Sequence, residues 1–350
     1  MPTLVVGPNW VGDMIMAHGL IVFLKSKRPD DPIHMLAPSW SLDVARRMPE
    51  IDQLIELPFD HGELRLKERW SFAKRLKFSR YHRAFILPNS LKSALIPAMA
   101  GIPRRIGWRG EYRYKLLTDF RILRESRFPR MIDRYMALGF PANLALSANQ
   151  LPEAPPYPRL AVDEASQALL VSRYGLDASR LVALCPGAEF GPAKQWPLEK
   201  FASLTTRLID AGYQVVLLGS PNDAGDAEAL LNQVPASRSA EVVNLAGDTT
   251  IPDAIDVIGL AKVVVTHDSG LMHVAAATGR PLVALFGPSS PDHTPPLSKK
   301  AITLTHPVPC HPCFQRECPL QHQACLSELS AGQVFEALSR QINRIRRCVY

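Results

Sequence analysis

The residues best suited to chemistry lie where an apolar run gives way to a polar turn. Residues 263–277 read Val-Val-Val-Thr-His-Asp-Ser-Gly-Leu-Met-His-Val-Ala-Ala-Ala. The three valines predict a strand buried on both faces, and the following residues predict a helix whose first N–H groups Asp268 or Ser269 can cap. Gly270 leaves room for a phosphate, which the free N–H groups and the positive end of the helix dipole would bind. An ordinary strand-to-helix turn explains the same residues, so both interpretations stand on this segment alone.

The same arrangement occurs twice more along the chain. Residues 4–12 join an apolar run to a turn with two glycines, and an apolar-rich helix is expected to follow from Asp13. These glycines do not fit the dinucleotide-binding fingerprint, so no nicotinamide or flavin site is expected there. A third unit, residues 181–193, ends beside Lys194. The flexible cation of Lys194 can reach a phosphate bound at that turn, or it can remain an ordinary surface lysine.

These turns are expected at the ends of parallel strands, because strand and helix patterns alternate along both halves of the chain. Strands are predicted near residues 3–7, 33–37, 84–88, 104–107, 181–185, 214–218, 242–245, 263–266 and 282–286. Helices are predicted near residues 12–27, 40–48, 68–78, 91–100, 131–139, 197–211, 223–233, 251–260 and 269–278. This alternation predicts an α/β fold with a doubly wound parallel sheet in each half.

Residues 151–158 separate the two halves and contain four prolines. Proline fixes φ and has no backbone N–H, so the segment is typical of a semi-rigid linker. We expect domains at residues 1–155 and 156–328, and a C-terminal helix within residues 329–350 that packs back on the first domain. Two such domains would face each other across a central cleft at the carboxyl ends of both sheets, where ligands are expected.

Length and composition are those of an ordinary two-domain chain. The sequence has 350 residues, of which 47% are apolar and 21% are charged. No run approaches the roughly 18 apolar residues of a membrane span, and the N-terminus lacks the basic and apolar regions of an export signal. We therefore expect a cytoplasmic protein.

The net charge of +7 is unevenly distributed between the two halves. Residues 1–155 carry 24 Lys and Arg against 15 Asp and Glu, a net charge of +9, whereas residues 156–350 carry 16 against 18, a net charge of −2. Such a basic half suits nucleic acid, anionic lipid headgroups or a phosphorylated or carboxylated substrate, or it is simply solvated helix surface. Nucleic acid is disfavoured because the sequence contains no helix-turn-helix, RNA-binding or zinc-finger signature.

Four cysteines near the C-terminus form a separate group. Cys310, Cys313, Cys318 and Cys325 follow the pattern C-x2-C-x4-C-x6-C. Four soft ligands at this spacing would suit a structural Zn²⁺, although the spacing matches no standard ribbon or finger. Packed or redox-capable thiols are the preferred interpretation.

Six motifs follow one another along the chain: Pro8-Asn9-Trp10-Val11-Gly12-Asp13-Met14, Leu87-Pro88-Asn89-Ser90-Leu91-Lys92-Ser93-Ala94, Gly107-Trp108-Arg109-Gly110-Glu111, Cys185-Pro186-Gly187-Ala188-Glu189-Phe190-Gly191-Pro192-Ala193-Lys194, His267-Asp268-Ser269-Gly270-Leu271-Met272-His273 and Gly287-Pro288-Ser289-Ser290-Pro291-Asp292. Together they resemble the lipopolysaccharide heptosyltransferases of glycosyltransferase family 9, type II more than type I. The resemblance implies a GT-B fold of two Rossmann-like domains and an inverting, metal-independent glycosyl transfer that needs no cofactor. It also implies ADP-L-glycero-D-manno-heptose as the donor in the C-terminal domain. The implied acceptor is a lipid A that bears Kdo and heptose, bound on the N-terminal domain.

The resemblance assigns donor-site roles to residues in the turns of the C-terminal half. These residues are Gly187, Ala188, Lys194, Asp223, Thr249, Asp268, Ser269, Gly270, Leu271 and His273. Lys194 is expected to contact the diphosphate and to stabilise the charge that develops on it as ADP leaves. Asp223 is expected to bind the ribose. Since an anion beside a phosphate is unfavourable, Asp268 is expected to bind sugar hydroxyls or to cap the helix.

An inverting transfer without a covalent intermediate needs one general base for the acceptor hydroxyl. The resemblance places Asp13 in this role, whereas the residue type alone would predict a helix N-cap. The residues expected to bind the acceptor are Asn9, Trp10, Lys92, Arg109 and Arg113. The last three are cations that would pair with acceptor phosphate or carboxylate groups, although any of them could form a surface ion pair instead.

Two alternatives concern the activity itself. A type I enzyme would add the first heptose directly to Kdo, and a basic nucleic-acid-binding protein would carry out no transfer at all. Because the implied acceptor is a lipid, we expect reversible association with the cytoplasmic leaflet of the inner membrane through the basic half, and no nucleic-acid partner.

Overall fold

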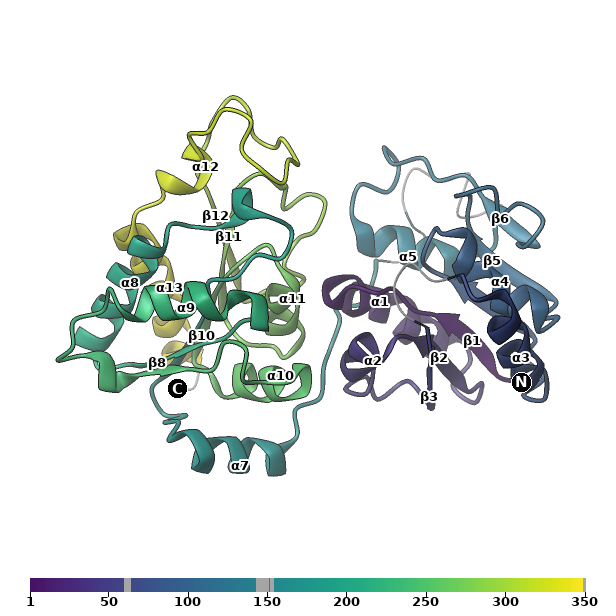
Figure 1. Cartoon of the computed structure of the whole chain (residues 1–350), viewed down its shortest axis with the longest axis horizontal. Helices are drawn as coiled ribbons and strands as arrows, with labels where there is room; N and C mark the ends of the chain where they lie inside the picture. Colours follow the sequence, from purple (N-terminus) through teal and green to yellow (C-terminus); the bar gives the residue numbers. More distant parts are fainter. Residues whose placement is uncertain (60–63, 143–150, 152–153, 349–350) are drawn as a thin grey trace. The chain divides into compact units, whose positions relative to one another are not determined.

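The computed structural model describes residues 1–59, 64–142, 151 and 154–348. The chain divides into two compact units, Met1–Pro158 and Arg159–Tyr350 (Figure 1). This division falls at the end of the proline-rich segment expected as a linker, of which Pro152 and Glu153 lie outside the described residues. In the described part of the chain, no helix is both long enough and apolar enough to cross a membrane.

The first unit alternates strands and helices, as the sequence predicts. Its elements are β1 (Thr3–Val6), α1 (Val11–Lys27), β2 (Ile33–Ala37), α2 (Ser39–Ala45), β3 (Gln53–Glu56), α3 (Leu66–Lys77), β4 (Arg83–Ile86), α4 (Leu91–Met99), β5 (Arg104–Trp108), β6 (Asp119–Arg121) and α5 (Met131–Gly139). Its core joins apolar residues of β1, β2 and β4 to those of α3 and α4.

The second unit repeats this pattern. Its elements are α7 (Glu164–Tyr174), β7 (Leu181–Cys185), the 3-10 helix η1 (Pro192–Lys194), α8 (Leu198–Asp210), β8 (Gln214–Leu217), η2 (Pro221–Asp223), α9 (Ala224–Leu231), η3 (Ser239–Glu241), β9 (Val242–Asn244), α10 (Ile251–Leu260), β10 (Val263–His267), α11 (Gly270–Ala277), β11 (Leu282–Phe286), β12 (Ala301–Thr305), α12 (Ala324–Ser327) and α13 (Ala331–Cys348). The apolar strands β7, β10 and β11 are buried along their whole length, as expected for parallel strands covered on both faces.

The two sheets are parallel and share one strand order. The first sheet runs β3-β2-β1-β4-β5-β6, and the second runs β12-β11-β10-β7-β8-β9. If β7 is counted as the first strand of its unit and the second sheet is read from β9, the two orders are identical. In each sheet the order reverses between two central strands, β1 and β4 in the first unit and β7 and β10 in the second. This Rossmann-like order confirms the predicted doubly wound α/β fold, and it places the expected ligand edge at the carboxyl ends of these four strands.

Several elements were not predicted, and most of them are short edge strands or lie on the surface. β3 and β6 have four and three residues, and β12 alternates half-buried with exposed positions, so none gives a strong apolar signal. Helix α7 buries only Leu170, although both of its ends carry recognisable signals. Asp163 caps its first N–H groups, and Gly175 ends it in the left-handed conformation.

The C-terminal helix α13 lies on the second unit. Its residues Val334, Ala337, Leu338 and Ile342 share one core cluster with β7, β8, β10 and β11, and the helix contacts α8. This corrects the expectation that the helix packs back on the first domain, because its apolar face is already buried against the sheet that precedes it.

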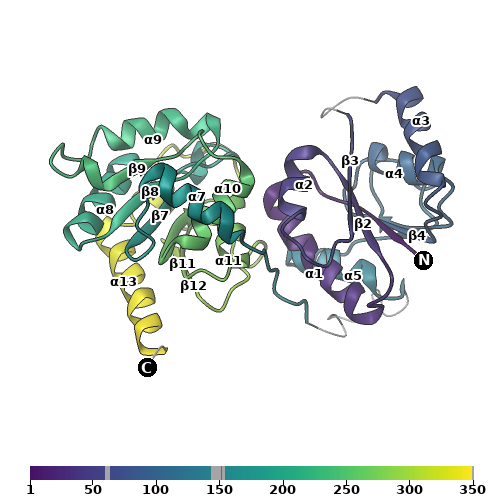
Figure 2. The ribbon, with the colours of Figure 1, turned by 90° about the horizontal axis from the view of Figure 1, so that it is seen from below.

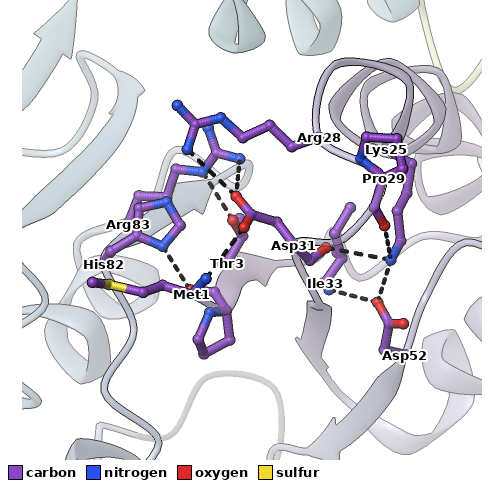
Figure 3. A network of polar contacts seen from close by, with 11 residues as sticks. Met1, Thr3, Lys25, Arg28, Pro29, Asp31, Ile33, Asp52, His82 and Arg83 are labelled. Atoms are coloured by element: carbon purple, nitrogen blue, oxygen red, sulfur yellow. Dashed lines mark hydrogen bonds and ion pairs between the residues drawn. The ribbon is translucent and has the colours of Figure 1, made fainter.

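A polar network closes the amino-terminal edge of the first sheet (Figure 3). Asp31 binds the N-terminal ammonium at 3.2 Å and faces the guanidinium groups of Arg28 and Arg83. Asp52 pairs with Lys25 Nζ at 2.8 Å. The network fixes the starts of β1, β2 and β4. These starts form the edge of the sheet opposite the expected ligand site.

Candidate active site

Asp13 lies at the carboxyl edge of the first sheet, in the first turn of α1. Trp10 occupies the N-cap position, so Asp13 does not cap the helix. The Tyr135 hydroxyl donates to Asp13 Oδ1 across 3.2 Å. Burial and the neighbouring carboxylate raise the pKa of Tyr135 well above its usual value, which keeps the phenol protonated as a donor. Asp13 is therefore a partly exposed carboxylate held in place by a buried phenol.

Tyr135 was not predicted as part of the site. It comes from α5, which packs against α1 but lies 122 residues further along the chain. No local pattern in the sequence signals such a pairing.

The other two predicted residues of this turn, Asn9 and Trp10, lie beside Asp13 in the chain. The Asn9 carbonyl accepts a hydrogen bond from Trp40 Nε1 at 2.9 Å, which ties the turn to α2. Trp10 is 63% exposed. Its ring is thus accessible, and acceptor binding by these two residues stays a prediction.

Arg113 was expected to contact the acceptor, and its position contradicts this. The side chain is fully buried, and every nitrogen of its guanidinium donates to the protein. Nη2 donates to Trp108 O at 2.7 Å and to Asn89 Oδ1 at 3.0 Å, Nε donates to Trp108 O, and Nη1 binds the turn at residues 88–93. Burial lowers the pKa of Arg113 to about 10, so the group remains charged at neutral pH. Arg113 is therefore an internal clamp on the loop that follows β4.

Neighbouring residues hold the same loop. Glu111 Oε2 accepts from the Leu91 N–H at 2.8 Å. At Gly110 a Cβ atom would come within 2.4 Å of the Asn89 carbonyl oxygen, so only glycine fits. Lys92 and Arg109 keep the accessibility that their predicted role requires, because Arg109 is exposed and Lys92 is half-buried in the first turn of α4.

In the second unit, the start of α11 is left open in the way that an anion site requires. Ser269 stands at the N-cap position, but its hydroxyl pairs with Thr266 Oγ1 at 3.2 Å and makes no capping hydrogen bond. Asp268 does not cap the helix either, because its carboxylate binds Lys194 and Thr294. The first N–H groups of α11, at Gly270 and Leu271, are therefore not used by the two side chains expected to cap them.

Lys194 and Asp268 form an ion pair directly before this helix. Lys194 Nζ donates to Asp268 Oδ2 at 2.7 Å and to the Asp268 carbonyl at 3.1 Å, and it lies 4.7 Å from the centre of the Phe190 ring. Both side chains are largely buried. The pair places a fixed cation beside the open helix start, which is the position expected for a residue that contacts the diphosphate.

Gly187 and Asp223 meet at the turn after β7. A Cβ atom on residue 187 would fall 2.1 Å from Asp223 Cγ, so this contact excludes every side chain. Asp223 Oδ2 accepts from both the N–H and the hydroxyl of Ser220 at 2.7 Å, and these bonds hold the carboxylate in a capping box. The adjoining pocket has a volume of about 350 Å³ and is lined by Ala188, Glu189, Gly191, Pro192, Gln195, Asn222, Asp223 and Asp226. Predicted donor residues thus wall a pocket large enough for part of a nucleotide.

His267 organises this region, a role that the sequence motif did not reveal. Its Nε2 accepts from the Trp196 N–H at 2.8 Å, and its Nδ1 lies 3.3 Å from the Gly187 carbonyl, to which it donates. Burial lowers the pKa of His267 to about 4, so the ring is neutral. It joins β10 to both the Gly187 turn and the residues after Lys194.

His273 and Thr249 are the two remaining residues predicted for the donor site. His273 is buried in α11, its Nδ1 has no hydrogen-bond partner among the described residues, and burial lowers its pKa to about 4. A neutral imidazole cannot supply a proton as a general acid near pH 7. Thr249 Oγ1 donates to the Leu245 carbonyl at 3.4 Å, whereas the neighbouring Thr250 caps α10.

The four C-terminal cysteines are free and share one small cavity. Cys310, Cys313, Cys318 and Cys325 all line it, and its volume is about 20 Å³. Backbone N–H groups of residues 320–323 lower the pKa of Cys318, whereas burial and the neighbouring thiols raise that of Cys325. Within the described ranges, no three histidine, cysteine or acidic side chains are gathered as a metal centre.

The two Rossmann-like units form a GT-B fold, and the open helix start beside a paired lysine fits a glycosyltransferase of this class. The chain belongs to glycosyltransferase family 9, the heptosyltransferases, whose family profile matches residues 69–324. Lipopolysaccharide heptosyltransferase 2 of Escherichia coli K12 is 43% identical over 340 residues, which cover 97% of this chain and 98% of that protein.

Two further relatives place the chain within the family. The solved structure of E. coli ADP-heptose lps heptosyltransferase II superposes with a TM-score of 0.88 at 41% identity, covering 99% of this chain and 100% of that one. Lipopolysaccharide heptosyltransferase 1 of Pseudomonas aeruginosa is 30% identical over 160 residues, which cover 43% of each chain. The predicted family, fold and enzyme class are confirmed.

Proposed function

We propose that this heptosyltransferase moves L-glycero-D-manno-heptose from ADP-heptose to the first heptose of the lipopolysaccharide inner core, with inversion at the anomeric carbon. The observation that carries the proposal is the 43% identity to a heptosyltransferase 2 along 97% of the chain. The similarity to a heptosyltransferase 1 covers less than half of either protein, which favours the second heptose over the first.

Asp13 acts as the general base in this proposal. Its carboxylate takes the proton of the acceptor hydroxyl while that oxygen forms the new bond to the anomeric carbon. The bond from the anomeric carbon to the phosphate oxygen breaks on the opposite face, and its electron pair leaves with ADP. The hydrogen bond from Tyr135 supports this role, because it fixes the direction of a carboxylate that remains partly exposed.

The second unit holds the leaving group. The N–H groups at Ser269, Gly270 and Leu271 bind the diphosphate, and Lys194 offsets the charge that develops on it. Asp268 keeps Lys194 in place through the 2.7 Å ion pair. We assign Gly187 and Ala188 to the opposite wall, Asp223 to the ribose, Thr249 to the adenine pocket and His273 to the packing beneath the diphosphate.

On the acceptor side, Asn9, Trp10, Lys92 and Arg109 are assigned to a lipid A acceptor that bears Kdo and heptose. Their accessibility supports the assignment. Because such an acceptor is embedded in a bilayer, the enzyme works at the cytoplasmic leaflet of the inner membrane and associates with it reversibly.

A transfer assay with two acceptors tests the proposal. The purified enzyme is given ADP-heptose together with a Kdo-bearing lipid acceptor that carries either no heptose or one heptose, and ADP release is measured. We expect turnover only with the acceptor that carries one heptose. Faster turnover with the other acceptor would assign the first-heptose activity, and no ADP release with either would overturn both.

A further inference from the structure

Exposed apolar side chains gather in the unit that carries the basic excess. Among the described residues, eighteen large apolar side chains are exposed, and fourteen of them belong to Met1–Pro158. A solvated basic surface has no need of large apolar side chains, whereas a surface that binds a lipid headgroup layer uses both kinds.

The segment of residues 64–80, which contains α3, combines the two features most strongly. It holds seven Lys and Arg residues against one Glu. Four of its large apolar side chains point into solvent, and Trp70 and Phe78 are 53% and 87% exposed. Leu64 and Leu66 are the other two, at 46% and 49%. This composition is typical of helices that lie in the plane of a membrane interface.

Helix α3 has one buried face and one exposed face. The buried face lies in the core of the first unit through Arg69, Phe72, Ala73 and Leu76. Leu66, Trp70 and Lys74 follow one another at four-residue spacing on the exposed face. Lys74 Nζ lies 3.3 Å from the centre of the Trp70 ring, so the aromatic and cationic groups form one continuous stripe.

The stripe lies on a helix that packs beside one of the helices assigned to the acceptor. Helix α3 packs against α4 (Figure 2), and α4 begins at the loop that Arg113 clamps and carries Lys92 in its first turn. A surface that holds α3 on a bilayer would therefore hold α4, the helix that carries Lys92, beside the same bilayer.

We propose that residues 64–80 dock the first unit on an anionic lipid surface. Trp70 and Phe78 enter the headgroup region, and the exposed lysines of α3 pair with lipid phosphates. The choice of lipid over a nucleic-acid duplex follows from the exposed apolar side chains, because a duplex presents its phosphates outward and keeps its bases stacked inside. The inference rests on the proposed function in that it names the membrane contact of an enzyme with a lipid-linked acceptor.

Vesicle binding of matched variants tests the docking surface. The whole enzyme is sedimented with vesicles of phosphatidylglycerol and phosphatidylcholine at low and high salt, and with phosphatidylcholine alone. We expect Lys74→Ala/Lys77→Ala to bind about 25-fold more weakly, since each cation near such a surface contributes about fivefold. Trp70→Ser/Phe78→Ser should lose binding about tenfold or more, and this loss should persist at high salt.

The control pair is Leu169→Ser/Leu320→Ser, which removes two exposed leucines, 72% and 59% accessible, from the second unit. It should bind vesicles like the wild type. Equal binding by the Trp70/Phe78 variant and the wild type would overturn the proposal, as would an equal loss in the control. So would equally tight binding of the wild type to a duplex of random-sequence DNA.

A second readout separates this proposal from the proposed function. On a deacylated, soluble acceptor, the α3 variants should turn over like the wild type, whereas with the acceptor embedded in vesicles their KM should rise. A similar loss on both acceptors would show damage to the fold or the site and would overturn the docking role. If neither the wild type nor the variants transfer heptose to either acceptor, the proposed function fails. Vesicle binding would still test the docking surface of residues 64–80.

Discussion

Replacing Arg113 with methionine distinguishes an internal clamp from a ligand contact. Methionine keeps much of the buried apolar stem but removes the guanidinium. The Trp108 carbonyl then loses two donors and Asn89 Oδ1 loses one. A buried acceptor left unsatisfied, such as the Trp108 carbonyl, costs about 1–3 kcal/mol, whereas the exposed Asn89 amide can bond to water instead. The loss at the Trp108 carbonyl should therefore lower the free energy of unfolding by about 1–3 kcal/mol.

Urea denaturation measures this loss, and Arg109→Met is the matched control. Arg109 lies in the same turn but is exposed, so its replacement should change stability by only about 0.5 kcal/mol. The Arg113 variant should also raise the KM for the acceptor, because the loop at Asn89 is released, while donor affinity stays unchanged. If Arg113→Met were as stable as the wild type and lost only acceptor affinity, Arg113 would be the ligand contact that the sequence predicted.

Three further predictions concern the second unit. Lowering the pH from 7 to 5 should lower the free energy of unfolding by about 2 kcal/mol through His267. The unfolded imidazole takes up a proton in this range, whereas the folded ring, with its pKa of about 4, does not. A His267→Asn variant whose stability falls with pH as steeply as that of the wild type would contradict this. Gly187→Ala should weaken ADP binding about tenfold to a hundredfold, because the new Cβ would collide with the Asp223 carboxylate. Calorimetry measures this affinity, and an unchanged value would show that the contact between residue 187 and Asp223 does not shape the donor site. Under reducing conditions, iodoacetamide should alkylate Cys318 before Cys325, because only the first has a lowered pKa; protection of both until a chelator is added would instead reveal a bound metal.

The fold could be predicted from the sequence wherever burial is complete. Strands β7 and β11 and helices α5 and α10 lie within a residue of their predicted limits, because their apolar residues and flanking turns leave one arrangement. The edge strands β3 and β12 could not be found in this way, since two positions of each face solvent and the others are only half-buried. Helix α13 was placed on the wrong domain, because an amphipathic pattern shows that a face is buried but not against what.

In the candidate site, too, local features could be predicted from the sequence and contacts between distant segments could not. The motifs located the turns that hold Asp13, Lys194 and the start of α11, because those turns follow directly from local chemistry. Partners from distant segments were missed, since the Tyr135 hydroxyl reaches Asp13 only through the packing of α5 on α1. Arg113 was misjudged for a related reason: its charge suggested a ligand, whereas burial turned it into a clamp.

The central claim is that the Asp13 carboxylate removes the acceptor proton, and Asp13→Asn tests it most directly. Steady-state transfer to the acceptor that carries one heptose is measured beside calorimetric binding of ADP, with Tyr135→Phe as the companion variant that keeps the carboxylate but removes its hydrogen bond. We predict that Asp13→Asn lowers kcat about 10²- to 10⁴-fold with ADP affinity unchanged, and that Tyr135→Phe lowers kcat less. Turnover of Asp13→Asn within about threefold of the wild type, a loss far below what a positioned base contributes, would contradict the account.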